Sequence, residues 1–341
     1  MNAQAQPAQK PVHPPFGSVL TDTMAVATYK DGKWSPYEVR RTGPIEMSPA
    51  AHVLHYSSTC FEGFKAYRWA DGSVNVFRMG RHIERMLQSA RALALAEPDA
   101  RQLEEMIVTV IDRVRDQVPE APGALYLRPI LFGTTPNIGA AASPPGELML
   151  IVLASPVWDY FAGGMKALKI YVETRATRCA SHLGVVKTGG NYAAAMGPTL
   201  AAKKQYGVDQ VLFCPGGEVQ ETGAANFLLI REGKILTRSL DTTFLHGVTR
   251  DSLLKMAPSL GYEVEERVFT VGEMLEWARD GEAALSGTAA VLAGVGTLVH
   301  EGREVKVGSG DVGPHTKKLR AALVAVQQGE ARDPHHWLRR I

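Results

Sequence analysis

Apolar and polar positions along this chain follow two alternating patterns, which predict short paired strands and amphipathic helices. Five segments consist of two apolar runs joined by Asp-Gly, Gly-Gly or Glu-Gly: residues 27–34, 66–77, 211–221, 228–238 and 297–307. Such pairs supply the positive φ angles of tight hairpin turns, so we expect largely antiparallel sheets. The glycine spacing of a dinucleotide-binding βαβ unit is absent from the sequence, which argues against a Rossmann enzyme.

Helical periodicity appears between these hairpins. Residues 103–118 place apolar side chains three and four positions apart on one stripe, and residues 83–90 carry a similar stripe. Further helices are predicted near 193–206, 248–260 and 312–328. Strands followed by helices, twice over, predict an α+β class with two domains.

The domain boundary is predicted from chain length and from a break in the apolar pattern. A chain of 341 residues is longer than one core usually supports. The apolar run 148–157 ends near a proline, and Gly163-Gly164 follow it. We therefore predict an N-terminal domain over 1–155, an interdomain linker over 156–165 and a C-terminal domain over 166–341.

Composition excludes several classes of protein. The net charge is only +2 and no segment concentrates Lys and Arg, so neither a nucleic-acid nor an anionic-membrane surface is expected. No apolar run is long enough to span a bilayer. Cys60, Cys179 and Cys214 stand far apart, which fits a reducing compartment. The first residues lack the features of secretory and mitochondrial leaders, so we expect a cytoplasmic protein without a metal site.

Lys187 stands in the segment GVVKTGGNY, at residues 184–192, where charge is low. An apolar, partly desolvated environment lowers the pKa of a lysine amine, which Schiff-base chemistry requires. A surface lysine whose aliphatic stem packs on apolar neighbours is the commoner alternative. The local pattern leaves both interpretations open.

Glu221 precedes a turn with little side-chain bulk in the segment EVQETGAAN. It is either a solvated hairpin carboxylate or a carboxylate that keeps a pyridine nitrogen protonated. In the second case the backbone amides of Ala224 and Ala225 are candidates to receive a substrate carboxylate.

Two further segments suit a phosphate. Gly247-Val248-Thr249 opens a predicted helix, whose first amides have no partner inside the helix. Ser286-Gly287-Thr288 offers two hydroxyls at the end of a predicted strand. Ordinary helix caps use the same residue types, and Arg85 by itself would be interpreted as a surface arginine.

Taken together, these segments resemble the class IV, or fold type IV, pyridoxal-phosphate enzymes, specifically the branched-chain amino-acid aminotransferases. The resemblance covers nearly the whole chain, from PFGSVLTDTM to the helix near residue 320. Its motifs occur in the family's order: HYSSTCFEGFKAYR, FRMGRHIERM, LYLRPILFGT, VKTGGNY, VQETGAANF, LHGVTRDSLL and LSGTAA.

The resemblance implies a site for pyridoxal 5'-phosphate and for an amino-acid substrate. The implied contacts to the cofactor's aldehyde, phenolic oxygen and ring nitrogen come, in that order, from Lys187, Tyr192 and Glu221. The implied phosphate cup consists of Arg85, the amides of Val248 and Thr249, and Thr288. The implied substrate pocket consists of Tyr56, Phe61 and Tyr126, with Arg128 at its edge and the amides of Ala224 and Ala225 near the carboxylate.

The implied reaction moves the amino group of L-leucine, L-isoleucine or L-valine to 2-oxoglutarate by a ping-pong mechanism. The family is a homodimer, in which the loop at 133–140 reaches the partner's site with Ile138 and Ala140 as candidate contacts. Two alternatives remain: another activity of the fold, such as a D-amino-acid aminotransferase or aminodeoxychorismate lyase, or a catalytically silent ligand-binding relative.

The sequence departs from the family pattern at three places. Ser181–Gly184 is one residue shorter than the family's Gly-Gly-Thr-Gly stretch, so the shape of this loop is open. Ala224 replaces a common threonine. Residues 290–293 replace a redox CxxC of some relatives, so no thiol switch is expected.

Overall fold

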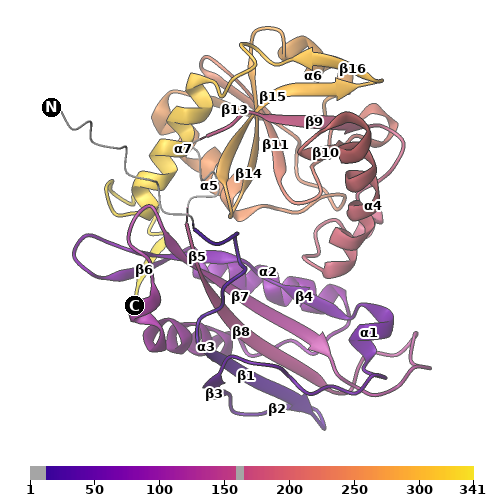
Figure 1. Ribbon diagram of the computed structural model, residues 1–341, viewed down its shortest axis with the longest axis vertical. Helices are drawn as coiled ribbons and strands as arrows, with labels where there is room; N and C mark the ends of the chain where they lie inside the picture. Colours follow the sequence, from indigo (N-terminus) through magenta and orange to yellow (C-terminus); the bar gives the residue numbers. More distant parts are fainter. Residues whose placement is uncertain (1–12, 159–164) are drawn as a thin grey trace, which may run out of the picture.

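The computed structural model describes residues 13–158 and 165–341, which form two β-sheets with helices packed against them (Figure 1). The first sheet has nine strands in the order β17-β6-β5-β7-β8-β1-β2, with β3 added beside β1 and β4 beside β7. Its strands are β1 (Thr23–Lys30), β2 (Lys33–Trp34), β3 (Glu38–Arg41), β4 (Thr59–Phe61), β5 (Phe64–Arg68), β6 (Val74–Phe77), β7 (Ala124–Gly133), β8 (Leu148–Val157) and β17 (Leu338–Arg340).

The second sheet has eight strands in the order β10-β9-β15-β14-β11-β12-β13, with β16 beside β15. Its strands are β9 (Leu168–Glu173), β10 (Gln210–Phe213), β11 (Asn226–Arg231), β12 (Lys234–Thr237), β13 (Glu263–Glu266), β14 (Glu282–Gly287), β15 (Val291–His300) and β16 (Arg303–Lys306). Only the pairs β9–β10, β9–β15 and β12–β13 are parallel among the described strands. The predicted α+β class with largely antiparallel sheets is confirmed.

Seven α-helices lie in the described part of the chain: α1 (His52–Tyr56), α2 (Met79–Ala92), α3 (Ala100–Arg113), α4 (Gly189–Tyr206), α5 (Val248–Met256), α6 (Val271–Trp277) and α7 (Pro314–Gln327). All five predicted helices are present, whereas the short α1 and α6 were not predicted. The stripe predicted over 103–118 ends as a helix at Arg113, and a 3₁₀ turn follows it. Val114 and Val118 are nevertheless buried, so the apolar pattern identified the core face correctly. None of these helices is long and apolar enough to cross a membrane.

Four of the five predicted hairpins are confirmed, and the one at 211–221 is wrong as a pair of strands. There β10 is followed by a 3₁₀ turn at Pro215–Gly217. With β10, the returning segment makes an isolated bridge between Leu212 and Thr222 rather than a ladder, and its Glu221 is buried (2 % exposed).

The predicted division into domains coincides with a change of sheet, since β1–β8 belong to the first sheet and β9–β16 to the second. β8 extends to Val157, which is inside the range 156–165 predicted as a linker. Residues 159–164 of that range lie outside the described residues. One strand crosses back, because β17 at the end of the chain pairs with β6 of the first sheet (Figure 1). The division itself stays a prediction.

Helices pack on both sheets, and the candidate site lies between the two halves. α2 and α3 pack on the first sheet, where Met86, Met106 and Ile107 are fully buried. α5 and α7 pack on the second sheet through β14 and β15. α4 lies at the side of the second sheet near β10 and also contacts β4, so it bridges the two halves (Figure 1).

Candidate active site

Lys187 lies where the two halves of the molecule meet, just before α4. Its backbone N–H donates to Ser89 Oγ of α2 (3.0 Å), and its carbonyl oxygen accepts from the N–H of Phe61 in β4 (3.0 Å). Its side chain is half-buried, and Nζ lies 2.8 Å from Tyr192 Oη. Since α4 begins at Gly189, Tyr192 occupies the first turn of this helix and faces back to the amine.

An aromatic wall flanks this amine. Lys187 Nζ lies 5.0 Å from the centroid of the Phe61 ring, and the Phe61 and Tyr192 rings are 5.3 Å apart. The Arg128 guanidinium stacks on Phe61 at 4.6 Å, and its Nη2 donates to Tyr126 Oη (2.9 Å). Tyr126 and Arg128 are two positions apart in β7 and therefore point to the same side of the sheet. The structure thus brings these predicted residues together.

Gly63 makes room for this wall. A Cβ atom at this position would lie only 1.8 Å from Tyr126 Oη, so no larger residue is compatible with the observed position of the phenol. On the opposite side of Tyr126, the ring of Phe16 packs edge-on at 4.9 Å. The segment before β1 therefore contributes Phe16 to the wall. No pocket residue was predicted in this segment from the sequence.

Tyr56 is placed differently from the other predicted pocket residues. It ends α1, its ring lies 4.8 Å from that of His52, and its hydroxyl donates to the carbonyl oxygen of Ile138. The loop at 133–140 is thereby fixed to α1. Ile138 is 66 % exposed, whereas Ala140 is 9 % exposed and its carbonyl oxygen bonds to His52 Nε2 (3.1 Å). Ala140 is thus buried within the chain, and of the two predicted contact residues only Ile138 is exposed.

Glu221 is a buried carboxylate with three donors. Arg178 Nη1 and the backbone N–H of Leu245 each lie 2.8 Å from Oε1, and Asn226 Nδ2 lies 3.0 Å from Oε2. Burial raises the pKa of Glu221 to about 7, against the lowering effects of the Arg178 charge and the Leu245 amide. The carboxyl of Glu221 therefore titrates near neutral pH.

Arg178 is a site residue that the sequence did not indicate. It is 1 % exposed, and its guanidinium lies 5.8 Å from the Tyr192 ring, so it connects Glu221 with the surroundings of Lys187. No local pattern distinguishes it from Arg175, which is exposed.

Arg85 is buried in an ion-pair cluster rather than exposed. Its Nε and Nη2 donate to the two oxygens of Glu62 (2.6 and 2.9 Å), and its Nη1 donates to His246 O (3.0 Å). His82 Nδ1 is 2.6 Å from the same carboxylate. Burial alone would raise the pKa of Glu62, but the charges of Arg85 and His82 hold that pKa well below its usual range. Glu62 lies inside the FEGFK motif and was not singled out from the sequence.

The start of α5 lies next to this cluster, since the carbonyl oxygen bound by Arg85 belongs to the residue before Gly247. A Cβ atom at Gly247 would lie 2.0 Å from Asn226 Oδ1, so the turn into α5 requires glycine. Val248 and Thr249 are buried in the first turn, where backbone amides have no acceptor inside the helix. Arg85 and these two residues are thus brought together.

The Ser286–Thr288 segment lies at the end of β14, the strand that pairs with β11. Ser286 is opposite Asn226 in the β11–β14 register, and its buried hydroxyl has no hydrogen-bond partner among the described residues. Thr288 is half-buried just beyond the strand. A buried hydroxyl without a partner is rare in native proteins and is typical of a place that a ligand or water occupies.

The amides of Ala224 and Ala225 point into their own turn. They lie 3.4 and 3.0 Å from Thr222 Oγ1, so the Thr222 hydroxyl already accepts from both. That these two amides bind a substrate carboxylate therefore stays a prediction. Binding a carboxylate would compete with their hydrogen bonds to Thr222 Oγ1.

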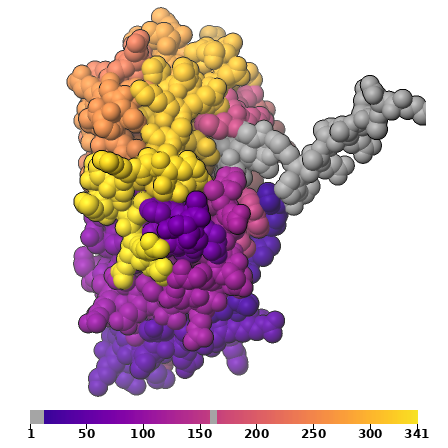
Figure 2. Space-filling view, turned by 90° about the vertical axis from the view of Figure 1, so that its left-hand side faces the viewer, coloured from indigo at the N-terminus to yellow at the C-terminus, as the bar shows by residue number. Residues whose placement is uncertain are grey.

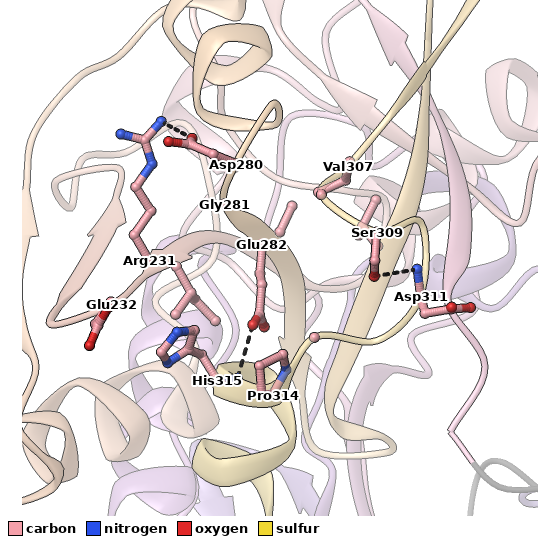
Figure 3. Close-up of a pocket in the computed structure, with 15 residues that line it drawn as sticks. Arg231, Glu232, Asp280, Gly281, Glu282, Val307, Ser309, Asp311, Pro314 and His315 are labelled. Carbon is pink, nitrogen blue, oxygen red and sulfur yellow. Dashed lines mark hydrogen bonds and ion pairs between the residues drawn. The ribbon is translucent and has the colours of Figure 1, made fainter.

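A separate cavity of about 320 Å³ lies at the start of α7 (Figure 3). Its polar groups serve structural contacts: Arg231 pairs with Asp280 (2.7 Å), and Glu282 accepts the backbone N–H groups of His315 (2.9 Å) and Thr316 (2.8 Å). It contains none of the predicted site residues. Across residues 13–158 and 165–341, no group of three or more His, Cys, Asp or Glu side chains could hold a metal ion.

Comparisons with known proteins agree with this geometry. The family model "Amino-transferase class IV" matches residues 59–296. A branched-chain-amino-acid aminotransferase of Mycobacterium tuberculosis (strain CDC 1551 / Oshkosh) is 38 % identical over 344 residues, covering 96 % of this chain and 92 % of that protein.

Two solved structures are similar over most of the chain. The branched-chain amino acid aminotransferase from Escherichia coli has a TM-score of 0.73 and 27 % identity, covering 92 % of this chain and 98 % of that one. A T.th. branched-chain amino acid aminotransferase, solved with pyridoxamine 5'-phosphate, has a TM-score of 0.74 and 25 % identity, covering 92 % and 97 %. The family and fold implied by the sequence motifs are confirmed.

Proposed function

Because this chain belongs to the class IV aminotransferases, and among them to the branched-chain-amino-acid aminotransferases, we propose that it uses pyridoxal 5'-phosphate held by Lys187. The proposed reaction moves the amino group of L-leucine, L-isoleucine or L-valine to 2-oxoglutarate and yields branched-chain 2-oxo acids and L-glutamate. The observation that carries this proposal is the half-buried Lys187 amine, 2.8 Å from the Tyr192 hydroxyl and beside an apolar wall.

The residues present fit this cofactor. Glu221, a buried carboxylate with a pKa of about 7, suits a partner that carries an N–H group, such as a pyridinium nitrogen. The Ser286 hydroxyl, which has no partner in the described parts of the chain, offers a donor for a phosphate at the other end, as do Arg85 and the amides at the start of α5. When bound, the cofactor supplies an aldehyde that condenses with amines and a ring that withdraws electrons from the substrate's α-carbon.

Lys187 and Tyr192 are proposed to act in the transfer of the proton from the substrate's α-carbon. With the cofactor and substrate bound, the free amine of Lys187 would be the base that removes the proton from the substrate's α-carbon. The Tyr192 hydroxyl lies 2.8 Å from this amine and would restrain its position. Glu221, whose ionised form Arg178 favours, is proposed to bind the protonated ring nitrogen. Ping-pong kinetics would follow from a covalent carrier that keeps the amino group between the two half-reactions.

The substrate side chain is proposed to lie against Tyr56, Phe61 and Tyr126, where each buried methylene gains about 0.8 kcal/mol. A second carboxylate placed against this wall requires a donor. Arg128, stacked on Phe61 and bound to the Tyr126 hydroxyl, is the proposed donor for the γ-carboxylate of glutamate and 2-oxoglutarate.

We further propose a cytoplasmic homodimer in which the loop at 133–140 completes the partner's pocket. Its support is four exposed apolar side chains on α1, on this loop and on α4: Leu54 (58 %), Ile138 (66 %), Met196 (58 %) and Leu200 (58 %). Isolated surface apolar residues are normal, but several on α1, α4 and the intervening loop favour an interface.

A screen of L-amino acids with 2-oxoglutarate as acceptor tests the function, with glutamate formation as the readout. Leucine, isoleucine and valine should be accepted, and Lys187→Ala should lose turnover by several orders of magnitude. Turnover of D-amino acids only, or pyruvate release from aminodeoxychorismate, would instead assign another activity of the same fold. An active enzyme should carry a yellow chromophore that borohydride bleaches. Absence of this chromophore from the purified protein would identify a catalytically silent relative.

A further inference from the structure

We propose that Arg78, held in place by the C-terminal strand, is a positioning residue that joins the two halves of the phosphate-binding site. This inference rests on the proposed function, in which Arg85 of α2 and the amides at the start of α5 bind the phosphate. These groups come from different halves of the molecule, because α2 packs on the first sheet and α5 on the second. Something must therefore fix one element against the other.

Arg78 makes direct contacts with α5. Its Nη1 donates to Asp251 Oδ2 (2.5 Å) and to Ser252 Oγ (2.9 Å). The same nitrogen lies 3.4 Å from the carbonyl oxygen of Val248, the first residue of the helix. The Arg78 side chain is only 4 % exposed, whereas that of Asp251 is 38 % exposed, so the guanidinium is buried and its carboxylate partner is at the surface.

Arg78 also determines where α2 begins. It is the residue before the helix, with a left-handed φ of 51°, and its carbonyl oxygen accepts the N–H of Arg81 (3.1 Å) and of His82 (3.3 Å). This conformation is uncommon for a residue with a side chain and needs support from its surroundings. Arg85 lies two helical turns further on. Arg78 thus precedes α2, which carries Arg85, and its side chain binds α5, which offers the amides.

The end of the chain covers this junction. The Arg78 N–H donates to the carbonyl oxygen of Trp337 (2.7 Å), and its guanidinium lies 5.0 Å from the Trp337 ring. Trp337 also packs edge-on against Phe77 at 5.7 Å, and β17 continues from it along β6. In Figure 2 the yellow C-terminal residues lie over the purple and magenta first half of the chain. The C-terminal segment therefore contacts both the backbone and the guanidinium of Arg78, the same guanidinium that binds α5.

The test compares two ligands that differ only in the phosphate. Apoprotein of the full chain is titrated with pyridoxal 5'-phosphate and with pyridoxal, and absorbance of the lysine adduct gives each dissociation constant. In Arg78→Met we expect the constant for pyridoxal phosphate to rise about tenfold or more, the scale of a lost contact to a charged group, and that for pyridoxal to change much less. Trp337→Leu should show the same selectivity with a smaller effect, and Arg78→Lys should restore part of the affinity.

Arg91→Met is the matched control, because Arg91 is on the same helix and pairs with Glu97 at the surface. Equal weakening of both ligands in Arg78→Met and Trp337→Leu, or no weakening, would overturn the inference. Arg85→Met separates this failure from that of the proposed function. If Arg85→Met leaves the ratio of the two constants unchanged, the phosphate site itself is misassigned. If it raises the ratio while the Arg78 and Trp337 variants do not, only the positioning role is refuted.

Discussion

Replacing Arg178 by methionine removes the charged partner of Glu221 while filling a similar volume. The buried carboxylate then keeps two neutral donors, the Leu245 amide and the Asn226 carboxamide. A hydrogen bond to a charged group contributes about 1.5–3 kcal/mol, and each 1.4 kcal/mol is about a tenfold change in an ionisation equilibrium. The ionisation constant of the Glu221 carboxyl should therefore fall about ten- to a hundredfold, which raises its pKa above the parent's value of about 7.

The direction of the pH effect follows from which form is active. Ionised Glu221 is the form proposed to bind the protonated ring nitrogen, and this form accumulates as pH rises through the pKa of the carboxyl. Loss of Arg178 raises that pKa further, because the charge that favoured ionisation is gone. As pH is lowered, the rate of the half-reaction with leucine should therefore begin to fall at a higher pH in the variant than in the parent. Raising the pH should restore the rate.

Single-turnover absorbance measurements from about pH 6 to 9 test this expectation. Arg178→Lys keeps a positive charge and should restore part of the parent's profile. Arg175→Met, an exposed arginine on the same segment, is the matched control and should leave the profile unchanged. A rate for Arg178→Met that is reduced by one constant factor at every pH would refute the reasoning.

Four other substitutions test separate parts of the site. Arg128→Met should slow the half-reaction with glutamate about tenfold more than that with leucine in single turnover; equal losses would assign this arginine to structure. Gly63→Ala should displace the Tyr126 ring, costing about 1–3 kcal/mol of stability in thermal unfolding and raising KM for leucine, whereas an unchanged KM would remove Tyr126 from the pocket. Ile138→Asp should shift sedimentation from dimer to monomer and reduce activity; a fully active dimer would contradict the proposed interface. Glu62→Gln should lower the free energy of unfolding by about 3–5 kcal/mol, because the buried Arg85 cation loses its anion, and a loss below about 1 kcal/mol would argue against this.

Local patterns in the sequence predicted what local chemistry determines. Gly-containing turns gave four hairpins, and helical periodicity gave the five longer helices, because both depend on neighbouring residues. The site residues were identified from motifs in a family order, and the structure brings Lys187, Tyr192, Phe61, Tyr126 and Arg128 together.

Residues whose role depends on distant partners were not predicted. Arg178 and Arg175 look alike in the sequence, and only the fold places one against the buried Glu221. Arg85 has the helical position of a surface residue, but Glu62 of a different element draws its guanidinium into the interior. The strand β17 has three residues and no distinctive pattern, so its pairing with β6 is visible only in the folded chain.

The pairing of β17 with β6 also constrains how the protein is made. During synthesis the first sheet is produced early, yet the free edge of β6 has no partner until residues 338–340 emerge, after the whole second half of the chain. An unpaired strand edge is a template for association with other chains. Nascent chains of this protein should therefore depend on chaperones or rapid synthesis to protect that edge, and a bulky tag fused behind Ile341 should reduce the soluble yield more than the same tag placed before Met1.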